Sequence, residues 1–310
     1  MLRAALLWLS ERPAIFNFIK HNGLARRMAR RFVAGEGLEH AEDATRELNA
    51  RDVTVTLDPL GESVRSADEA ASARDSAITI LDRIHETGLA ANISVKLTQM
   101  GLDLDPELAA DNMCAILERA RRYETFVRID MEASDYVQPT LDLFAERLHP
   151  AYGAYVGVVI QSMLRRSAED IERLIDLHAR VRLVKGAYME PGEVAFPDKR
   201  DVDDSFAQLT ERLLANGNYP AVATHDERLI EHAKAYAAAH GIQSGAFEFQ
   251  MLYGVRRDLM ARLRAAGHNM RIYVPFGTDW YPYLMRRLAE RPANLAFIAA
   301  NIVRETFARS

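Results

Sequence analysis

From Val53 onward, short runs rich in β-branched and aromatic residues alternate eight times with longer stretches of helical pattern. Strands and helices that alternate in this way form a parallel sheet, and eight such units close a (βα)8 barrel. The predicted strands are 53–57, 92–97, 126–130, 155–160, 181–185, 221–224, 246–250 and 271–275, and the predicted helices are 68–87, 106–122, 138–148, 168–179, 203–216, 226–239 and 256–266. No linker rich in proline, glycine or serine divides this region, so one domain is expected.

The residues before the barrel pattern are helical by periodicity, in three pieces at 2–9, 16–28 and 41–48. The sequence therefore predicts an α/β chain with an N-terminal helical elaboration at 1–50 and a (βα)8 TIM-barrel catalytic domain at 51–310.

Charge and composition exclude several classes of protein. The 39 basic and 44 acidic side chains give a net charge of -5, so nucleic-acid binding is not expected. The single cysteine, Cys114, excludes an internal disulfide framework, and no two histidines are spaced i, i+4, so no metal site is expected. The apolar opening ends at Glu11, Arg12 and Pro13, and no apolar stretch reaches the length of a membrane span, which predicts a cytoplasmic protein.

Polar side chains alternate with apolar ones along the predicted strands, so each strand has one polar face. That face carries Thr54, Thr56, Asp58, Ser94, Lys96, Thr98, Arg128 and Asp130, with Arg182, Glu248 and Gln250 from later strands. Buried charges are unfavourable by several kcal/mol unless they pair or meet a polar ligand. The pattern favours a polar-lined barrel mouth; an internal ion-pair network without a ligand, for instance Lys96 with Asp130, is the alternative.

The segment 271–292 reads as strand, turn and helix, with Asp279 as the predicted N-cap. On the helix, Tyr283, Arg286, Arg287 and Glu290 share one face, because they are three, four and seven residues apart. Two adjacent guanidinium groups can clamp a carboxylate or a phosphate. The alternative is a solvated face on which Glu290 pairs with Arg286.

Several common catalytic and nucleotide-binding motifs are absent from the sequence, which limits the reactions to be considered. There is no Walker A loop, no G-x-S-x-G elbow, no H-E-x-x-H and no G-x-G-x-x-G after a strand. A Rossmann dinucleotide site is therefore disfavoured, whereas a flavin held at the mouth of a barrel is compatible with the pattern.

The helix motif Tyr283-x-x-Arg286-Arg287-x-x-Glu290-Arg291 resembles the signature helix of the proline dehydrogenases, flavoenzymes that also form the amino-terminal activity of bifunctional proline utilisation proteins. Nine further segments resemble the family in the same order: FVAGE (32–36), LDPLGE (57–62), ISVKLTQMG (93–101), RIDME (128–132), QS (161–162), RLVKGAY (182–188), ATHD (223–226), FEFQMLYG (247–254) and IYVPFGTDW (272–280). The resemblance implies a distorted (βα)8 barrel with FAD at its carboxyl-end mouth. It also implies oxidation of L-proline to Δ1-pyrroline-5-carboxylate by hydride transfer to flavin N5, with electrons passed on to a quinone.

The resemblance also assigns roles to individual residues. Substrate-binding roles fall on Lys96, Arg286, Arg287, Glu290, Tyr273, Tyr283, Tyr188 and Leu252, and catalytic roles on Asp130 and Arg182. Flavin contacts fall on Met131, Gln161, Arg182, Lys185, Gly186, Ala187, Thr224 and His225, and Glu62 is expected to pair with Arg182 as a gate. The link between Tyr273 and Tyr283 departs from the long bifunctional relatives, because it is slightly shorter and contains Pro282.

Partners follow from the same resemblance. The sequence ends at Ser310 without an aldehyde dehydrogenase module, so a monofunctional enzyme and a separate pyrroline-5-carboxylate dehydrogenase are expected. Amphipathic and basic N-terminal helices, together with the need to reach a quinone, predict peripheral contact with the inner face of a membrane. Three other interpretations remain open from the residues: a methylenetetrahydrofolate-reductase-like flavin barrel, a Schiff-base aldolase using Lys96 or Lys185, and a non-catalytic barrel.

Overall fold

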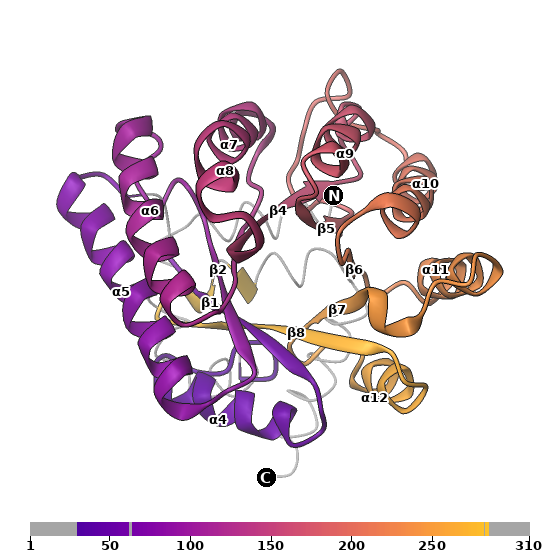
Figure 1. The fold of residues 1–310 in the computed structure, drawn as a ribbon, viewed down its shortest axis with the longest axis horizontal. Coiled ribbons are helices and arrows are strands. Elements are labelled where there is room, and N and C mark those ends of the chain that lie inside the picture. The colour runs from indigo at the N-terminus through magenta and orange to yellow at the C-terminus, as the bar shows by residue number, and fades with distance from the viewer. Residues whose placement is uncertain (1–29, 62–63, 282, 285–310) are drawn as a thin grey trace, which may run out of the picture.

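Eight parallel strands form a closed barrel in which each strand pairs with its neighbour in sequence and β8 pairs with β1 (Figure 1). The computed structural model describes residues 30–61, 64–281 and 283–284. The strands are β1 (Thr54–Pro59), β2 (Ala91–Val95), β3 (Val127–Ile129), β4 (Val156–Gln161), β5 (Arg180–Val184), β6 (Ala221–Ala223), β7 (Glu248–Leu252) and β8 (Asn269–Phe276). All eight overlap the predicted ranges, so the predicted barrel is confirmed.

Helices surround the barrel on the outside, as Figure 1 shows. They are α4 (Leu38–Asn49), α5 (Ala67–Thr87), α6 (Pro106–Arg122), α7 (Val137–Leu143), α8 (His149–Tyr152), α9 (Ser167–Asp176), α10 (Lys199–Asn216), α11 (Glu227–Ala239) and α12 (Arg257–Ala265). The helix predicted at 138–148 is interrupted, because a π-helical turn at Phe144–Leu148 separates α7 from α8. In the part of the chain that the structure describes, no helix is both long enough and apolar enough to cross a membrane.

Local sequence signals explain where several helices begin and end. The side chains of Ser66, Asp105 and Asp226 each accept a hydrogen bond from a backbone amide in the first turn of α5, α6 and α11. Gly88 ends α5 in the left-handed region, with a φ of 64°. The chain can therefore turn directly into β2.

The two faces of each strand meet different surroundings. Val55, Leu57, Ile93 and Val127 are fully buried in the apolar core between the strands and the helices. The polar face points into the barrel, where Thr56, Ser94, Arg128, Arg182 and Gln250 are all at most 4% exposed. The predicted alternation is confirmed, and the barrel interior is polar and charged.

α4 packs on β1 and β8, so this part of the predicted N-terminal elaboration shares the barrel core. The helical pieces predicted at 2–9 and 16–28 lie outside the described residues.

Candidate active site

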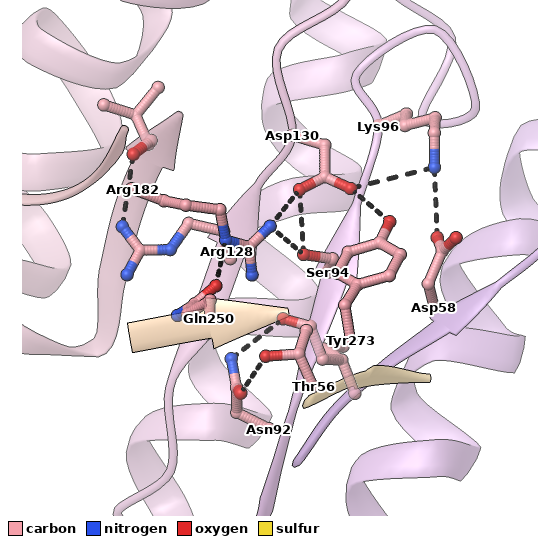
Figure 2. A network of polar contacts seen from close by, with 12 residues as sticks. Thr56, Asp58, Asn92, Ser94, Lys96, Arg128, Asp130, Arg182, Gln250 and Tyr273 are labelled. Carbon is pink, nitrogen blue, oxygen red and sulfur yellow. Dashed lines mark hydrogen bonds and ion pairs between the residues drawn. The ribbon is translucent and has the colours of Figure 1, made fainter. Parts of the chain in front are cut away.

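Asp130, directly after β3, is the centre of a polar cluster at the carboxyl ends of the strands (Figure 2). Its Oδ1 accepts hydrogen bonds from Arg182 Nη1 at 2.7 Å and from Ser94 Oγ at 2.9 Å. Its Oδ2 accepts one from the Tyr273 hydroxyl at 2.6 Å. Residues from β2, β5 and β8 thus converge on the carboxylate that follows β3, and the carboxyl end of a barrel is where enzymes of this architecture carry their chemistry.

Lys96 brings a cation to this cluster from the end of β2. Its Nζ lies 3.0 Å from Asp58 Oδ1 and 3.9 Å from Asp130 Oδ2, and its side chain is 22% exposed. Burial alone would lower the pKa of Lys96, but the negative charges of Asp58 and Asp130 outweigh burial and raise that pKa. Lys96 is therefore a permanent cation at neutral pH. This opposes the Schiff-base interpretation, because a Schiff-base lysine must react as a neutral amine.

Asp58 is a site residue that the sequence reasoning did not select. It is 2% exposed in β1 and, among the described residues, is the closest carboxylate to Lys96. The available signal was its position on the polar face of the first strand, in step with Thr54 and Thr56. What the sequence did not show was that Asp58 and the residue after β2 approach within ion-pair distance.

Tyr273 and Arg182 complete the cluster from opposite sides of Asp130. Burial, and then the charge of Asp130, raise the pKa of Tyr273 well above that of an ordinary tyrosine, so the phenol stays protonated and donates. The Arg182 guanidinium lies over the Tyr273 ring, 5.3 Å from its centroid. Its Nε donates to Gln250 Oε1 at 2.6 Å, while its buried Nη2 has no hydrogen-bond partner among the described residues.

The side chains predicted to contact a cofactor lie at the ends of β3 to β6. Gln161 Nε2 donates to the backbone oxygen of Glu132 at 2.9 Å. Lys185 Nζ lies between Asp203 Oδ1, at 2.5 Å, and Asp226 Oδ2, at 3.1 Å. These two carboxylates fix the position of the Lys185 ammonium group at the mouth of the barrel.

Backbone contacts position the residues after β6. Thr224 Oγ1 accepts a hydrogen bond from the Asp226 amide at 3.1 Å. His225 Nε2 accepts one from the Leu252 amide at 2.9 Å, so a neutral His225 ring carries its proton on Nδ1. The orientation of His225 is therefore coupled to β7.

The segment after β5 combines an unusual backbone with exposed apolar surface. Gly186 has a φ of 107°, and a Cβ there would lie 2.4 Å from Met163 Sδ. Tyr188 is 38% exposed and Met189 is 68% exposed. Ala187 next to them is half-buried, as is Leu252, whereas Met131 and Tyr283 are buried. Of the predicted site residues, Glu62, Arg286, Arg287 and Glu290 lie outside the described residues.

Comparisons with known proteins show the family to which the chain belongs. A family model described as proline dehydrogenase matches residues 41–300. Proline dehydrogenase 1 of Bacillus subtilis subsp. natto is 44% identical over 305 residues, which are 98% of this chain and 100% of the relative. The proline dehydrogenase of Deinococcus radiodurans is 40% identical over 307 residues and 98% of each chain.

Larger proteins match over part of their length. The bifunctional protein PutA of Escherichia coli is 30% identical over 88% of this chain and 24% of its own length. The crystal structure of proline utilization A from Bdellovibrio bacteriovorus superimposes with a TM-score of 0.81 at 24% identity, over 92% of this chain and 38% of that one. The structural likeness shows the barrel fold.

These matches decide between the interpretations that the residues left open. A reductase of the methylenetetrahydrofolate type, a Schiff-base aldolase and a non-catalytic barrel are excluded, because near full-length relatives at 40–44% identity are proline dehydrogenases. The chain belongs to the proline dehydrogenase family and is an oxidoreductase of proline catabolism.

Proposed function

We propose that the chain oxidises L-proline to Δ1-pyrroline-5-carboxylate, with FAD as its resident cofactor and a quinone as the final electron acceptor. The observation that carries the proposal is the cluster at the barrel mouth, in which Lys96, Arg182 and Tyr273 converge on Asp130. The reaction removes a hydride from C5 of proline and a proton from its nitrogen, so two electrons and two protons leave and a C=N bond forms. FAD, when bound, supplies the two-electron acceptor for the hydride.

The residues at the mouth suit a flavin. Gly186 has the positive φ of a position where backbone approaches a ligand closely, and Tyr188 with Met189 offers exposed apolar surface beside it. The buried Nη2 of Arg182 is a donor without a partner among the described residues. The residues that would hold the cofactor are Met131, Gln161, Arg182, Lys185, Gly186, Ala187, Thr224 and His225.

Lys96 has the charge that a proline carboxylate needs. Asp58 and Asp130 hold it cationic despite its partial burial. In the proposal Arg286 and Arg287 clamp the same carboxylate, with Glu290 beside them as the sequence pattern predicts, because paired guanidinium forks fix both its position and its plane. Tyr273, Tyr283, Tyr188 and Leu252 would enclose the apolar ring.

Arg182 and Asp130 would act as an oriented pair. Asp130 fixes the guanidinium of Arg182 through a 2.7 Å bond, and the positive charge of Arg182 would stabilise negative charge that develops on the cofactor. Glu62 would pair with Arg182 when the site closes. Neither Arg182 nor Lys96 needs to change its protonation state in this scheme.

The electron acceptor and the use of the product extend the proposal. A quinone is held in a membrane, so the chain would contact the membrane surface peripherally from the cytoplasmic side. Failure both to pellet with anionic vesicles and to reduce quinone analogues would remove this part. A separate pyrroline-5-carboxylate dehydrogenase would consume the product; coupled NADH formation with such an enzyme tests it.

Anaerobic titration with L-proline tests the central proposal. The purified protein should be yellow, and its flavin absorbance should bleach on addition of L-proline. A matched sample of Lys96→Met should keep its flavin and require much more proline for the same bleaching. A colourless preparation that takes up no FAD contradicts the cofactor; a yellow preparation that L-proline does not bleach contradicts the substrate.

A further inference from the structure

A second polar site lies deeper in the barrel, below the Asp130 cluster. It is a cavity of about 30 Å³ lined by Thr56, Asn92, Phe126, Arg128, Arg180, Arg182, Glu248, Gln250 and Arg271. Most of these residues stand at or near the first residue of their strand, so the cavity lies toward the amino ends of the strands, on the side away from Lys96 (Figure 2).

Four arginines line this cavity, and two of them have a carboxylate partner. Arg182 is paired with Asp130 at 2.7 Å, and Arg271 is paired with Glu248 at 2.9 Å. Arg128 and Arg180 form no ion pair with any described residue. When Glu248 and the nearby Asp130 are counted against the four arginines, two positive charges remain in excess.

The remaining contacts of Arg128 and Arg180 do not neutralise their positive charges. Arg128 donates through Nη1 to the backbone oxygens of Val158, at 3.1 Å, and Arg180. Its Nε and the Nε of Arg180 are buried without a hydrogen-bond partner in the described chain. Both guanidinium groups lie over the ring of Phe126, with their carbons 4.7 Å and 4.3 Å from its centroid.

Burial makes this arrangement unfavourable for the protein alone. Arg128 is 2% exposed. Burial, and then the charges of Arg182 and Arg180, lower the pKa of Arg128 well below its ordinary value. An uncompensated charge of this kind is strongly destabilising unless an ion of opposite sign accompanies it.

A glycine in β4 keeps the arrangement possible. A Cβ at Gly157 would lie 2.7 Å from the Phe126 ring and 2.8 Å from Arg128 Nη1. Glycine inside a strand is characteristic of a position where other groups approach the backbone closely. The strand therefore leaves room for the stacked arginine and ring beside the cavity.

We propose that this cavity binds one monatomic anion, of the chloride type, between Arg128 and Arg180. The cavity has space for two or three water-sized bodies, since about 10–15 Å³ is enough for one, and this space is sufficient for a single halide ion. A water molecule would fill the space but leave both charges uncompensated. The anion stabilises the barrel from its amino end, so this inference does not depend on the proposed reaction.

Halide exchange in the full-length holoenzyme tests the site. Replacing gluconate with chloride at constant ionic strength should raise the Tm by roughly 2–4 °C, because a ligand that binds only the folded state stabilises it. Arg180→Met should lose this chloride response. This variant should still fold. The Arg180 side chain donates no hydrogen bond to any described residue, so its removal leaves no acceptor unpaired. The matched control is Arg121→Met, an arginine over the ring of Tyr152 on the barrel exterior, which should keep the response.

A crystal grown in bromide gives the independent measurement. An anomalous scattering peak inside the cavity, between Arg128 and Arg180, is expected. A cavity without a bromide peak overturns the proposal, as does a chloride-dependent rise in Tm that Arg180→Met retains in full.

Discussion

The Tyr273 hydroxyl donates a 2.6 Å hydrogen bond to Asp130 Oδ2, and this contact joins the middle of β8 to the end of β3 across the barrel mouth. Because Arg182 and Ser94 occupy the other oxygen, each oxygen of Asp130 has a fixed donor. The direction of the carboxylate is therefore set by three strands at once. Asp130 in turn lies close enough to Lys96 to stabilise the positive charge of the lysine.

Tyr273→Phe should reduce kcat/KM for L-proline about 10-fold, the effect of losing roughly 1.5 kcal/mol from a hydrogen bond to a charged group. Flavin content should not change, because the hydroxyl acts on Asp130. Steady-state kinetics and the flavin-to-protein absorbance ratio measure the two effects. Tyr152→Phe is the control: its hydroxyl donates to Glu118 at 3.1 Å on the barrel exterior, so stability alone should respond. Equal kinetics in both variants would contradict the role of Tyr273.

Asp58→Asn should make the reaction sensitive to alkaline pH. Asp58 and Asp130 raise the pKa of Lys96, so the wild-type lysine stays charged until the pH passes the ordinary lysine value of about 10.4. With Asp58 neutral, burial is opposed only by the charges of Asp130 and Glu132, and the pKa of Lys96 falls. The profile of kcat/KM against pH should then decline at a lower pH than in the wild type, with kcat/KM about 10-fold lower on its alkaline side.

The acid side of the same profile provides the control for Asp58→Asn. At acidic pH Lys96 is charged in both proteins, so the variant should come closest to wild-type activity there. A uniform loss of activity across the whole pH range would show that Asp58 acts through packing and not through the charge of Lys96.

Gly186→Ala should lower the affinity for FAD. A non-glycine residue at a φ of 107° is strained, and its Cβ would meet Met163 Sδ at 2.4 Å, so either the segment after β5 or the Met163 side chain must shift. Flavin content after dialysis, and FAD titration of the stripped protein, measure the loss. Gly192→Ala in the same connection is the control, because a Cβ there meets nothing within 4 Å. Retention of stoichiometric FAD by Gly186→Ala would argue against close approach of a cofactor.

The barrel could be predicted from the sequence because its signals are local. Alternation of Val55 and Leu57 with Thr56 and Asp58 defines both the strand and its two faces within a few residues. The interrupted helix after β3 was not predicted, because the residues of the π-helical turn, Phe144–Leu148, include no proline or glycine that would mark a break.

The site was less accessible to prediction, because its contacts depend on register between distant strands. The pairing of Thr56 with Tyr273, for example, brings together residues more than 200 positions apart. Motifs could identify Lys96 and Asp130, but not that Asp58 would be the nearest partner of Lys96 in the described part of the chain. Nor did the motifs indicate two arginines, Arg128 and Arg180, that have no carboxylate partner among the described residues at the base of the barrel.

Glu248→Gln should destabilise the protein at neutral pH by roughly 3–5 kcal/mol, since it leaves Arg271, whose side chain is only 17% exposed, without its carboxylate partner. Burial opposes the charge of Glu248, but Arg271 outweighs burial, and the pKa of Glu248 is lowered. Its stabilising effect is therefore complete above the pKa of an unfolded glutamate, about 4.3, and is lost as the pH falls through the folded value. Urea unfolding between neutral and acidic pH should show the gap between wild type and variant narrowing in acid. A gap that stays constant would contradict the charge-based explanation.

Arg286→Ala and Arg287→Ala test the proposed clamp on the proline carboxylate. Each guanidinium would contribute charge-assisted hydrogen bonds of roughly 1.5–3 kcal/mol, so each variant should weaken proline use about 10- to 150-fold while FAD stays bound. The loss should appear mainly in KM, because the clamp holds the substrate before and during the reaction. Arg257→Ala is the matched control: this exposed arginine of α12 stacks on Tyr253 and should leave the kinetics unchanged. If proline kinetics are the same in all three variants, the carboxylate must be bound elsewhere, and Lys96 becomes the principal cation that holds it.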